Sequence, residues 1–145
     1  MKNSILSYKQ VLTSFIKVLQ KNGIKESSEL ILKDTLSIIK KSTKKSPFLS
    51  IIEAFEKAKP FCEIKSVRIS GTNYKVPVEI KPERQKILVF KWIILNAVKR
   101  SGFTLKNNLA KEFLDTCNLT SKTIKMCDDF HKTAESNKIY IQFRN

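Results

Sequence analysis

Six cationic side chains lie close together near the middle of the chain. Within 22 residues the sequence places Lys65, Arg68, Lys75, Lys81, Arg84 and Lys86. Lysine and arginine bind phosphate groups, and each contact releases counterions condensed on a nucleic acid. Tyr74 lies among them. These residues indicate nucleic-acid binding; the alternative is a basic strand pair that faces only solvent.

The whole chain is basic, but unevenly so. Its 145 residues carry a formal net charge of +15. Residues 1–60 contribute +7, residues 61–106 another +7, and residues 107–145 only +1. Such an excess is typical of a protein with a polyanionic partner, most often a nucleic acid. Because Lys91 interrupts the longest apolar run, none is long enough to cross a bilayer, and we expect no membrane partner.

Other kinds of chemistry have little support. His131 is the only histidine and falls on a polar helix with no fixed neighbour, so a catalytic triad has no good candidate base. Asp128 and Asp129 fit a solvated helix face better than a carboxylate dyad. Three glycines are too few for a phosphate-binding glycine loop. We therefore expect no enzyme and no cofactor.

The cysteines favour neither a disulfide framework nor a metal site. They are Cys62, Cys117 and Cys127. They are few and scattered, and no C-x-x-C pair occurs. Four nitrogen or sulfur ligands at workable spacing are missing, so we expect no structural zinc. The prediction is three reduced thiols, partly buried.

A secondary-structure element must hold these cations in place, and the pattern of residues 62–81 predicts that it is a β-ribbon. Residue types alternate along 63–69 and again along 74–80, with valine, isoleucine and tyrosine dominating one set. One face of the second run then holds Tyr74, Val76, Val78 and Ile80. A lone two-stranded ribbon is marginal in water. It must therefore lie on the helices, or project and bind something.

The connection and the edge of this ribbon also follow from residue type. The two runs are separated by Ser-Gly-Thr-Asn, in which Gly71 and Asn73 suit the positive φ of a hairpin loop. Pro77 has no backbone N–H to donate to a ladder, so its strand is expected to be an edge.

Apolar residues at helical spacing predict six helices around the ribbon. The expected ranges are about 9–21, 27–39, 47–58, 82–99, 105–117 and 121–138. A basic linker at 40–45 precedes the start signal Ser46-Pro47, and Thr104 is a candidate cap. The fourth helix is apolar almost all round, which indicates a central, buried position. The prediction is a mainly α fold, a six-helix bundle with one protruding β-hairpin between helices 3 and 4, in a single domain over residues 1–145.

Several segments resemble one protein family. They are EIKSVRISGTNYKVPVEIKPER, KWIILNAVKR, LAKEFLD and HKTAESNKIYIQFRN. They are similar to the family of small-subunit ribosomal protein seven, of bacterial or organellar type. The similarity runs in order from Leu12 to Arg144. Its most specific part is Tyr-x-Val-Pro-Val-Glu-x-x-Pro-x-Arg, from Tyr74 to Arg84.

This resemblance implies a structural constituent of the small ribosomal subunit, with six helices and a β-ribbon between the third and fourth. The family binds ribosomal RNA of the 3′ major domain in the head and helps to start head assembly. Its ribbon lies near the exit site, by messenger RNA and transfer RNA. Its protein neighbours lie in the head and platform and include the platform protein numbered eleven. The alternative is a free helical DNA-binding regulator with a helix-turn-helix.

By position, the resemblance assigns RNA binding to three groups of residues. The ribbon group is Lys65, Arg68, Gly71, Tyr74, Lys75 and Pro77. Phosphate contacts at the ribbon base and the start of the fourth helix fall to Lys81, Arg84 and Lys86. The first helix and the loop after it supply Lys17, Lys21 and Lys25. Trp92 matches the family's tryptophan and is expected in the core.

The chain also departs from its relatives. Ser70-Gly71 stands where relatives often have paired glycines, and Arg84-Gln85 where many have two arginines. Only 4 of the 28 basic residues are arginine, and 17 isoleucines stand against 5 alanines. This composition is typical of an A/T-rich genome. It favours a mitochondrial ribosome, with a plastid or the bacterial cytoplasm as alternatives.

Overall fold

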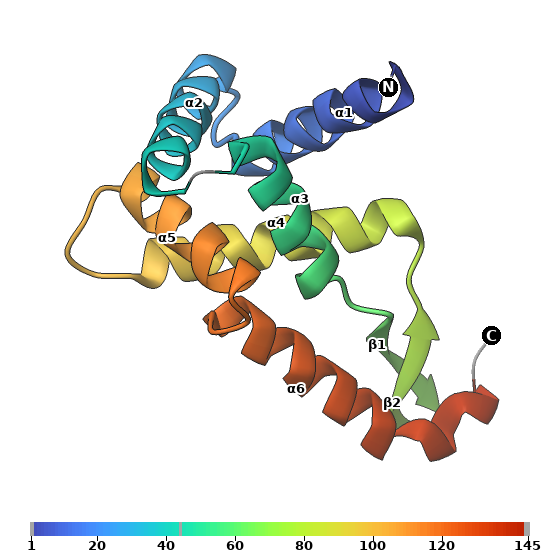
Figure 1. Ribbon diagram of the computed structural model, residues 1–145. Helices are drawn as coiled ribbons and strands as arrows, with labels where there is room; N and C mark the ends of the chain where they lie inside the picture. Colours follow the sequence, from blue (N-terminus) through green and yellow to red (C-terminus); the bar gives the residue numbers. More distant parts are fainter. Residues whose placement is uncertain (1, 44, 144–145) are drawn as a thin grey trace.

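The computed structural model describes residues 2–43 and 45–143, with side chains from Lys9 onward. Lys44 of the expected basic linker and Arg144 of the last similar segment lie outside the described residues. The elements, in chain order, are α1 (Lys2–Leu19), α2 (Lys25–Ser42), α3 (Pro47–Ala58), β1 (Cys62–Ile69), β2 (Thr72–Glu79), α4 (Pro82–Lys99), α5 (Leu105–Cys117), α6 (Lys122–Ser136) and the 3-10 helix η1 (Lys138–Phe143) (Figure 1).

Over the part of the chain that the structure describes, the predicted order of elements is confirmed: six α-helices, with one antiparallel strand pair between α3 and α4. Ser46, Thr104 and Ser121 are the N-cap residues of α3, α5 and α6. Of these three hydroxyls, only that of Ser121 makes a capping bond, accepting the backbone N–H of Ile124 at 3.2 Å. At Ser46 and Thr104 the extended backbone of the N-cap residue, and not a side-chain hydrogen bond, accompanies the start of the helix.

Three helix boundaries differ from the prediction, and local interactions account for two of them. α1 begins at Lys2 instead of near residue 9. α2 runs from Lys25 to Ser42 and so takes in part of the expected linker, because lysines in a last turn interact favourably with the helix dipole. α6 stops at Ser136, where the side-chain amide of Asn137 donates to the Thr133 carbonyl oxygen at 2.7 Å and competes with further helix.

The core is built around α4, which lies in the middle of the helices in Figure 1. Phe15 of α1 packs edge-on against Phe90 of α4, with ring centroids 5.1 Å apart, and also contacts Phe113 of α5 at 5.5 Å. Trp92 is buried, as expected. Leu95 and Val98 are exposed, so the prediction that α4 is buried nearly all round is wrong for that side.

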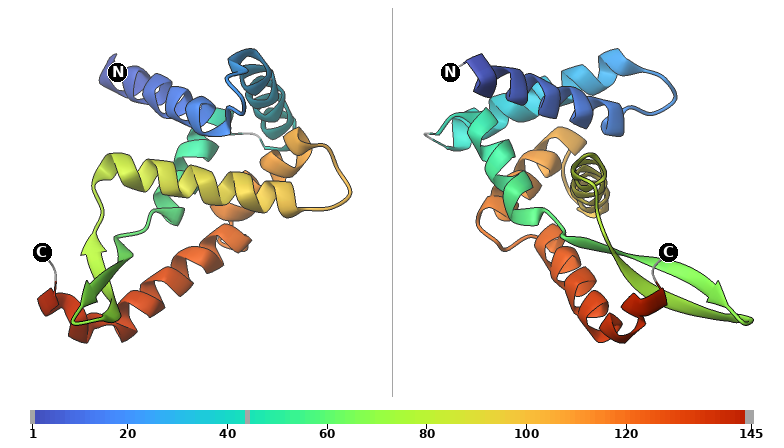
Figure 2. Two further views of the ribbon diagram at one scale, coloured as in Figure 1. Left: turned by 180° about the vertical axis from the view of Figure 1, so that it is seen from behind. Right: turned by 90° about the vertical axis from the view of Figure 1, so that its right-hand side faces the viewer.

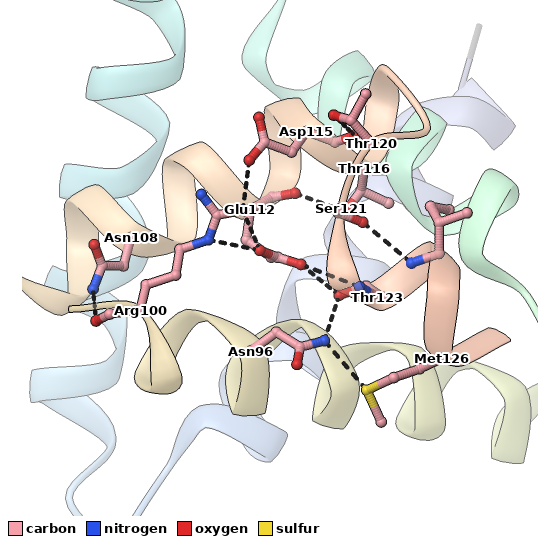
Figure 3. A network of polar contacts seen from close by, with 11 residues as sticks. Asn96, Arg100, Asn108, Glu112, Asp115, Thr116, Thr120, Ser121, Thr123 and Met126 are labelled. Carbon is pink, nitrogen blue, oxygen red and sulfur yellow. Dashed lines mark hydrogen bonds and ion pairs between the residues drawn. The ribbon is translucent and has the colours of Figure 1, made fainter. Parts of the chain in front are cut away.

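A buried polar network fixes α4, α5 and the start of α6 relative to one another (Figure 3). Glu112 of α5 is fully buried and accepts a hydrogen bond from Arg100 Nε at 2.8 Å. Its other oxygen accepts from the Thr123 hydroxyl at 2.7 Å, and that hydroxyl accepts from the Asn96 side-chain amide at 3.0 Å. Arg100 also pairs with Asp115. Because Glu112 is buried and both of its carboxylate oxygens are hydrogen-bonded within the chain, this carboxylate is a structural group.

The ribbon leaves the helices and extends away from them, as the right-hand view of Figure 2 shows. Its register pairs Cys62 with Glu79 at the base and Ile69 with Thr72 at the tip. The loop is therefore two residues, Ser70 and Gly71, with φ of +48° and +86°. Two positive φ values match a type I′ hairpin turn. Asn73 lies in β2, so its expected place in the loop is wrong and Ser70 takes the positive φ instead.

The ribbon does not project alone, because η1 lies against it. The ring of Tyr74 in β2 packs against Tyr140 and Phe143, each with centroids 5.2 Å away. The sequence predicts no element beyond residue 138. Residues 139–143 are mostly apolar, but a 3-10 helix of six residues has no long periodicity to detect.

Candidate nucleic-acid interface

The strand register distributes the three ribbon cations over two faces. Residues directly opposite in an antiparallel pair point the same way, and neighbours along a strand alternate. Arg68 is opposite Asn73, and Lys75 is opposite Ser66, so Arg68 and Lys75 share one face as diagonal neighbours. All four of these residues are exposed. This face can meet a phosphate backbone without any rearrangement of the chain.

Lys65 lies on the other face. It is opposite Val76, which is fully buried, and Tyr74 lies on the same side of the ribbon. Its side chain still reaches solvent, and Lys65 Nζ lies 3.8 Å from a carboxylate oxygen of Glu63. Lys65 therefore lies on the opposite face of the ribbon from Arg68 and Lys75. The positions of these cations in the sequence do not by themselves show this.

Glu63 connects the ribbon to the start of α4. Its second carboxylate oxygen accepts a hydrogen bond from Arg84 Nε at 3.4 Å. Pairs this exposed are worth little to stability, about 0–1 kcal/mol. Lys81, the N-cap residue of α4, is exposed beside them. The pair occupies one N–H donor of Arg84 at the ribbon base and leaves most of the others for another partner.

A cleft of about 610 Å³ separates α1 from the first half of α4. It brings Lys17 of α1 together with Lys86 of α4, two predicted site residues 69 positions apart. Lys91 lines the same cleft and was not predicted to bind. The signal was present, since Lys91 interrupts the longest apolar run. The Lys91 side chain is exposed and reaches solvent at this cleft.

Other lining groups make the cleft partly polar. The polar ones are Gln10, Ser14 and Glu83, and the apolar ones are Val18 and Ile87. A smaller neighbouring hollow along α1 adds Lys9 and Thr13. The only carboxylate among these residues is that of Glu83, so lysines outnumber acids and the surface attracts anions.

Two predicted cations lie beyond this cleft. Lys21 is exposed in the α1–α2 loop, and Lys25 begins α2, where its Nζ lies 3.2 Å from a carboxylate oxygen of Glu29. Neither lines the α1–α4 cleft. Their role in RNA binding therefore stays a prediction.

Three further predicted residues shape the ribbon. Gly71 forms the turn together with Ser70. Apart from its chain neighbours, no atom lies within 4 Å of the position that a Cβ would occupy at Gly71, so only the positive φ favours glycine there. Pro77 pairs with Ile64 in the ladder. Tyr74 is half-buried against η1, which occupies part of its ring.

Cys127 and His131 come closest to a catalytic pair, but their surroundings are structural. Cys127 Sγ lies 4.0 Å from His131 Nδ1. The other ring nitrogen accepts the backbone N–H of Phe61 at 3.1 Å, and the two rings stack, so the expectation that His131 lacks fixed neighbours is wrong. Burial raises the pKa of Cys127 to about 11, which keeps the thiol protonated at neutral pH and removes its nucleophilicity.

The remaining sequence expectations concern thiols, metals and membranes. All three cysteines are free thiols; Cys127 is buried and the other two are half-buried, as predicted. Within the described residues, no cluster of three metal-ligating side chains occurs. Over the same residues, no helix combines the length and apolarity needed to cross a membrane.

Comparison with known proteins gives one consistent family. The family model described as "Ribosomal protein S7p/S5e" matches residues 2–138. A "Small ribosomal subunit protein uS7" from Heliobacterium modesticaldum is 36% identical over 135 residues, covering 93% of this chain and 86% of that protein. The protein of the same description from Leptospira biflexa is 38% identical over 135 residues, with the same coverage. One from Cereibacter sphaeroides is 36% identical over 134 residues, covering 92% and 86%.

Proposed function

The chain belongs to the ribosomal protein S7p/S5e family, and from this membership we propose that it is a structural constituent of the small ribosomal subunit. The family consists of non-enzymatic structural proteins, in agreement with the expectation from the sequence. We propose that residues 1–145 act as one ribosomal domain that binds ribosomal RNA.

One observation carries the RNA-binding proposal. The fold brings Lys17, Lys86 and Lys91 into one cleft. The same end of α4 continues into the ribbon, whose exposed face carries Arg68 and Lys75. Cations from three separate stretches of sequence thus lie in the cleft and on the ribbon that leads into the same end of α4. A folded RNA with closely spaced phosphates fits such a surface better than a small ligand does.

The finer assignment follows the family resemblance. We propose that the RNA is the 3′ major domain of the small subunit, in the head, and that binding helps to start head assembly. The ribbon would then lie near the exit site, by messenger RNA and transfer RNA. Its protein partners would be head and platform neighbours, including the platform protein numbered eleven. The projection of the ribbon beyond the helices supports this reach (Figure 2).

We propose that the location is a ribosome of bacterial type, a proposal supported by the bacterial origin of the relatives described above. We propose a mitochondrial ribosome, on the basis of the low arginine and high isoleucine content. A plastid and the bacterial cytoplasm are the alternatives.

Co-sedimentation tests the assignment. The tagged chain, expressed in its source cells, should remain with small subunits after a high-salt wash. Release into the free pool would contradict it. A competition assay separates the DNA-binding alternative: the chain should prefer a transcript of the 3′ major domain to duplex DNA of equal length, whereas the reverse preference would support a regulator.

A further inference from the structure

A second group of lysines lies where α2 ends and α3 begins. Lys40 and Lys41 are in the last turn of α2, and Lys45 lies between the two helices. We call these three residues the α2–α3 lysine patch. They border a hollow of about 930 Å³, which Ser46 and Phe48 also line. Among the described residues that line this hollow there is no carboxylate, so lysines dominate its charge.

The patch has few partners inside the protein. Among the described residues, Lys40 and Lys41 form no ion pair. Lys45 Nζ lies 3.9 Å from a carboxylate oxygen of Glu53, which also pairs with Lys57 at 2.7 Å. Lysines in a last turn interact favourably with the helix dipole, and this accounts for Lys40 and Lys41. It does not account for Lys45, which follows the helix, or for the exposure of Phe48 (41%) beside it.

The distribution of charge along the chain also indicates that the α2–α3 lysine patch has an anionic partner. Residues 1–60 carry as large an excess, +7, as the segment that contains the ribbon. The cations of the α1–α4 cleft and the α1–α2 loop explain only part of it. Like charges so close together repel each other, and a polyanion offsets that repulsion.

The position of the patch sets it apart from the interface described above. In the right-hand view of Figure 2, the end of α2 and the start of α3 lie at the left of the molecule, while the ribbon extends to the right. The helices lie between them. One RNA segment therefore cannot contact both surfaces without wrapping around the bundle.

We propose that the α2–α3 lysine patch binds the phosphate backbone of a second segment of ribosomal RNA, separate from the segment held by the ribbon and the α1–α4 cleft. Phe48 offers an apolar ring beside these lysines on which an unpaired base stacks. The chain then joins two RNA segments on opposite faces. This inference rests on the proposed RNA-binding function.

The test compares three variants of the full chain that fold normally by circular dichroism. The patch variant is K40A/K41A/K45A, and the ribbon variant is R68A/K75A. The control is K122A/K125A/K132A, which removes the same charge from exposed positions of α6. The probe is a transcript of the bacterial 3′ major domain. Affinity is measured from about 0.05 to 0.2 M salt, and backbone protection by hydroxyl-radical footprinting.

The patch variant should bind about tenfold more weakly or worse at about 0.1 M salt, and its salt slope should fall by about 2–3. It should lose protection at nucleotides different from those lost by the ribbon variant. The control should match the unmodified chain. An equal loss in the control would overturn the proposal, because net charge alone would explain the result. Loss of the same nucleotides in patch and ribbon variants would also overturn it.

The remaining outcomes separate this inference from the proposed function. Weaker binding by the ribbon variant, with no change for the patch variant, would reject the patch and leave the function intact. No change for either variant would reject both. Normal RNA affinity of the patch variant, with its absence from sedimented small subunits, would mean that the patch contacts a protein, which contradicts the proposal.

Discussion

Two arginine–glutamate pairs, one in the helical interior and one at the ribbon base, use the same residue types differently. Arg100 and Glu112 join α4 to α5, and their side chains are 25% and 0% exposed. Arg84 and Glu63 join α4 to β1, and theirs are 54% and 16% exposed. The interior carboxylate also accepts a hydrogen bond from Thr123, whereas the ribbon carboxylate lies near a second cation, Lys65.

The difference shows that some arginines of this chain are bonded inside the protein while others keep exposed N–H donors. Partial burial disfavours the charge of Arg100, but hydrogen bonds to Asp115 and Glu112 outweigh it and raise the pKa of the guanidinium. Arg100 thus stays charged with its bonds satisfied inside the protein. Arg84 bonds only one carboxylate through Nε, and a guanidinium has five N–H donors. The interior arginine stabilises the fold, whereas Arg84 at the ribbon base keeps exposed donors, which we propose bind RNA.

The largest expected effect is that of Arg100→Ala. It leaves the Glu112 carboxylate buried without its cation, and breaking such a pair costs about 3–5 kcal/mol of unfolding free energy. Denaturant unfolding followed by circular dichroism measures this cost. The matched control is Arg84→Ala, which should change stability by no more than about 1 kcal/mol. Equal costs for both variants would remove the distinction between the two regions.

The next effect concerns the attachment of the ribbon to η1. Tyr74→Ala removes two ring contacts, to Tyr140 and Phe143, and should cost about 1–2 kcal/mol of local stability. Amide hydrogen exchange of β1 and β2 should speed up accordingly, while exchange in α4 and α5 should not. Tyr74→Phe keeps the ring and should exchange like the unmodified chain. Unchanged exchange in Tyr74→Ala would show that η1 does not hold the ribbon.

A smaller effect is expected at the ribbon tip. Both turn residues have positive φ, which costs an ordinary L-residue about 1–2 kcal/mol. Gly71→Ala should therefore destabilise the tip by about 1 kcal/mol, and Ser70→Gly should stabilise it by a similar amount. Hydrogen exchange at Thr72 and Ile69 measures both. If the two substitutions act in the same direction, the turn is not the one described.

The smallest effect sharpens the role of Glu63. Glu63→Gln removes the carboxylate shared by Lys65 and Arg84. Both cations then face phosphate without competition, and RNA affinity should rise about two- to threefold, about 0.5 kcal/mol. Glu135→Gln, an exposed position on α6, is the control for net charge. A fall in affinity for Glu63→Gln would mean that the pair positions Arg84 for RNA and does not compete with it.

Much of the fold was predictable because local signals agreed. Helical periodicity, Ser46-Pro47 and the alternation along the ribbon each act over a few residues, so the order of helices and strands followed from sequence. The turn was placed imprecisely because Ser70 carries a positive φ that serine rarely adopts, and Asn73 was the better candidate by type.

The site was less predictable, because it depends on what packing brings together. Sequence spacing cannot show that Lys17 and Lys91 share a cleft, or that Lys65 and Arg68 point to opposite faces of the ribbon. Nor could it show that η1 covers part of Tyr74. These facts depend on helix packing and strand register, which residue types alone do not fix.

The salt dependence of RNA binding tests most directly whether the ribbon cations contact phosphate. For R68A/K75A, the slope of log affinity against log salt concentration should fall by about 2, one per lost contact. K122A/K125A, which loses the same charge from α6, should keep the slope of the unmodified chain. An unchanged slope for R68A/K75A, or an equal fall in the control, would contradict the claim that the exposed ribbon face binds RNA.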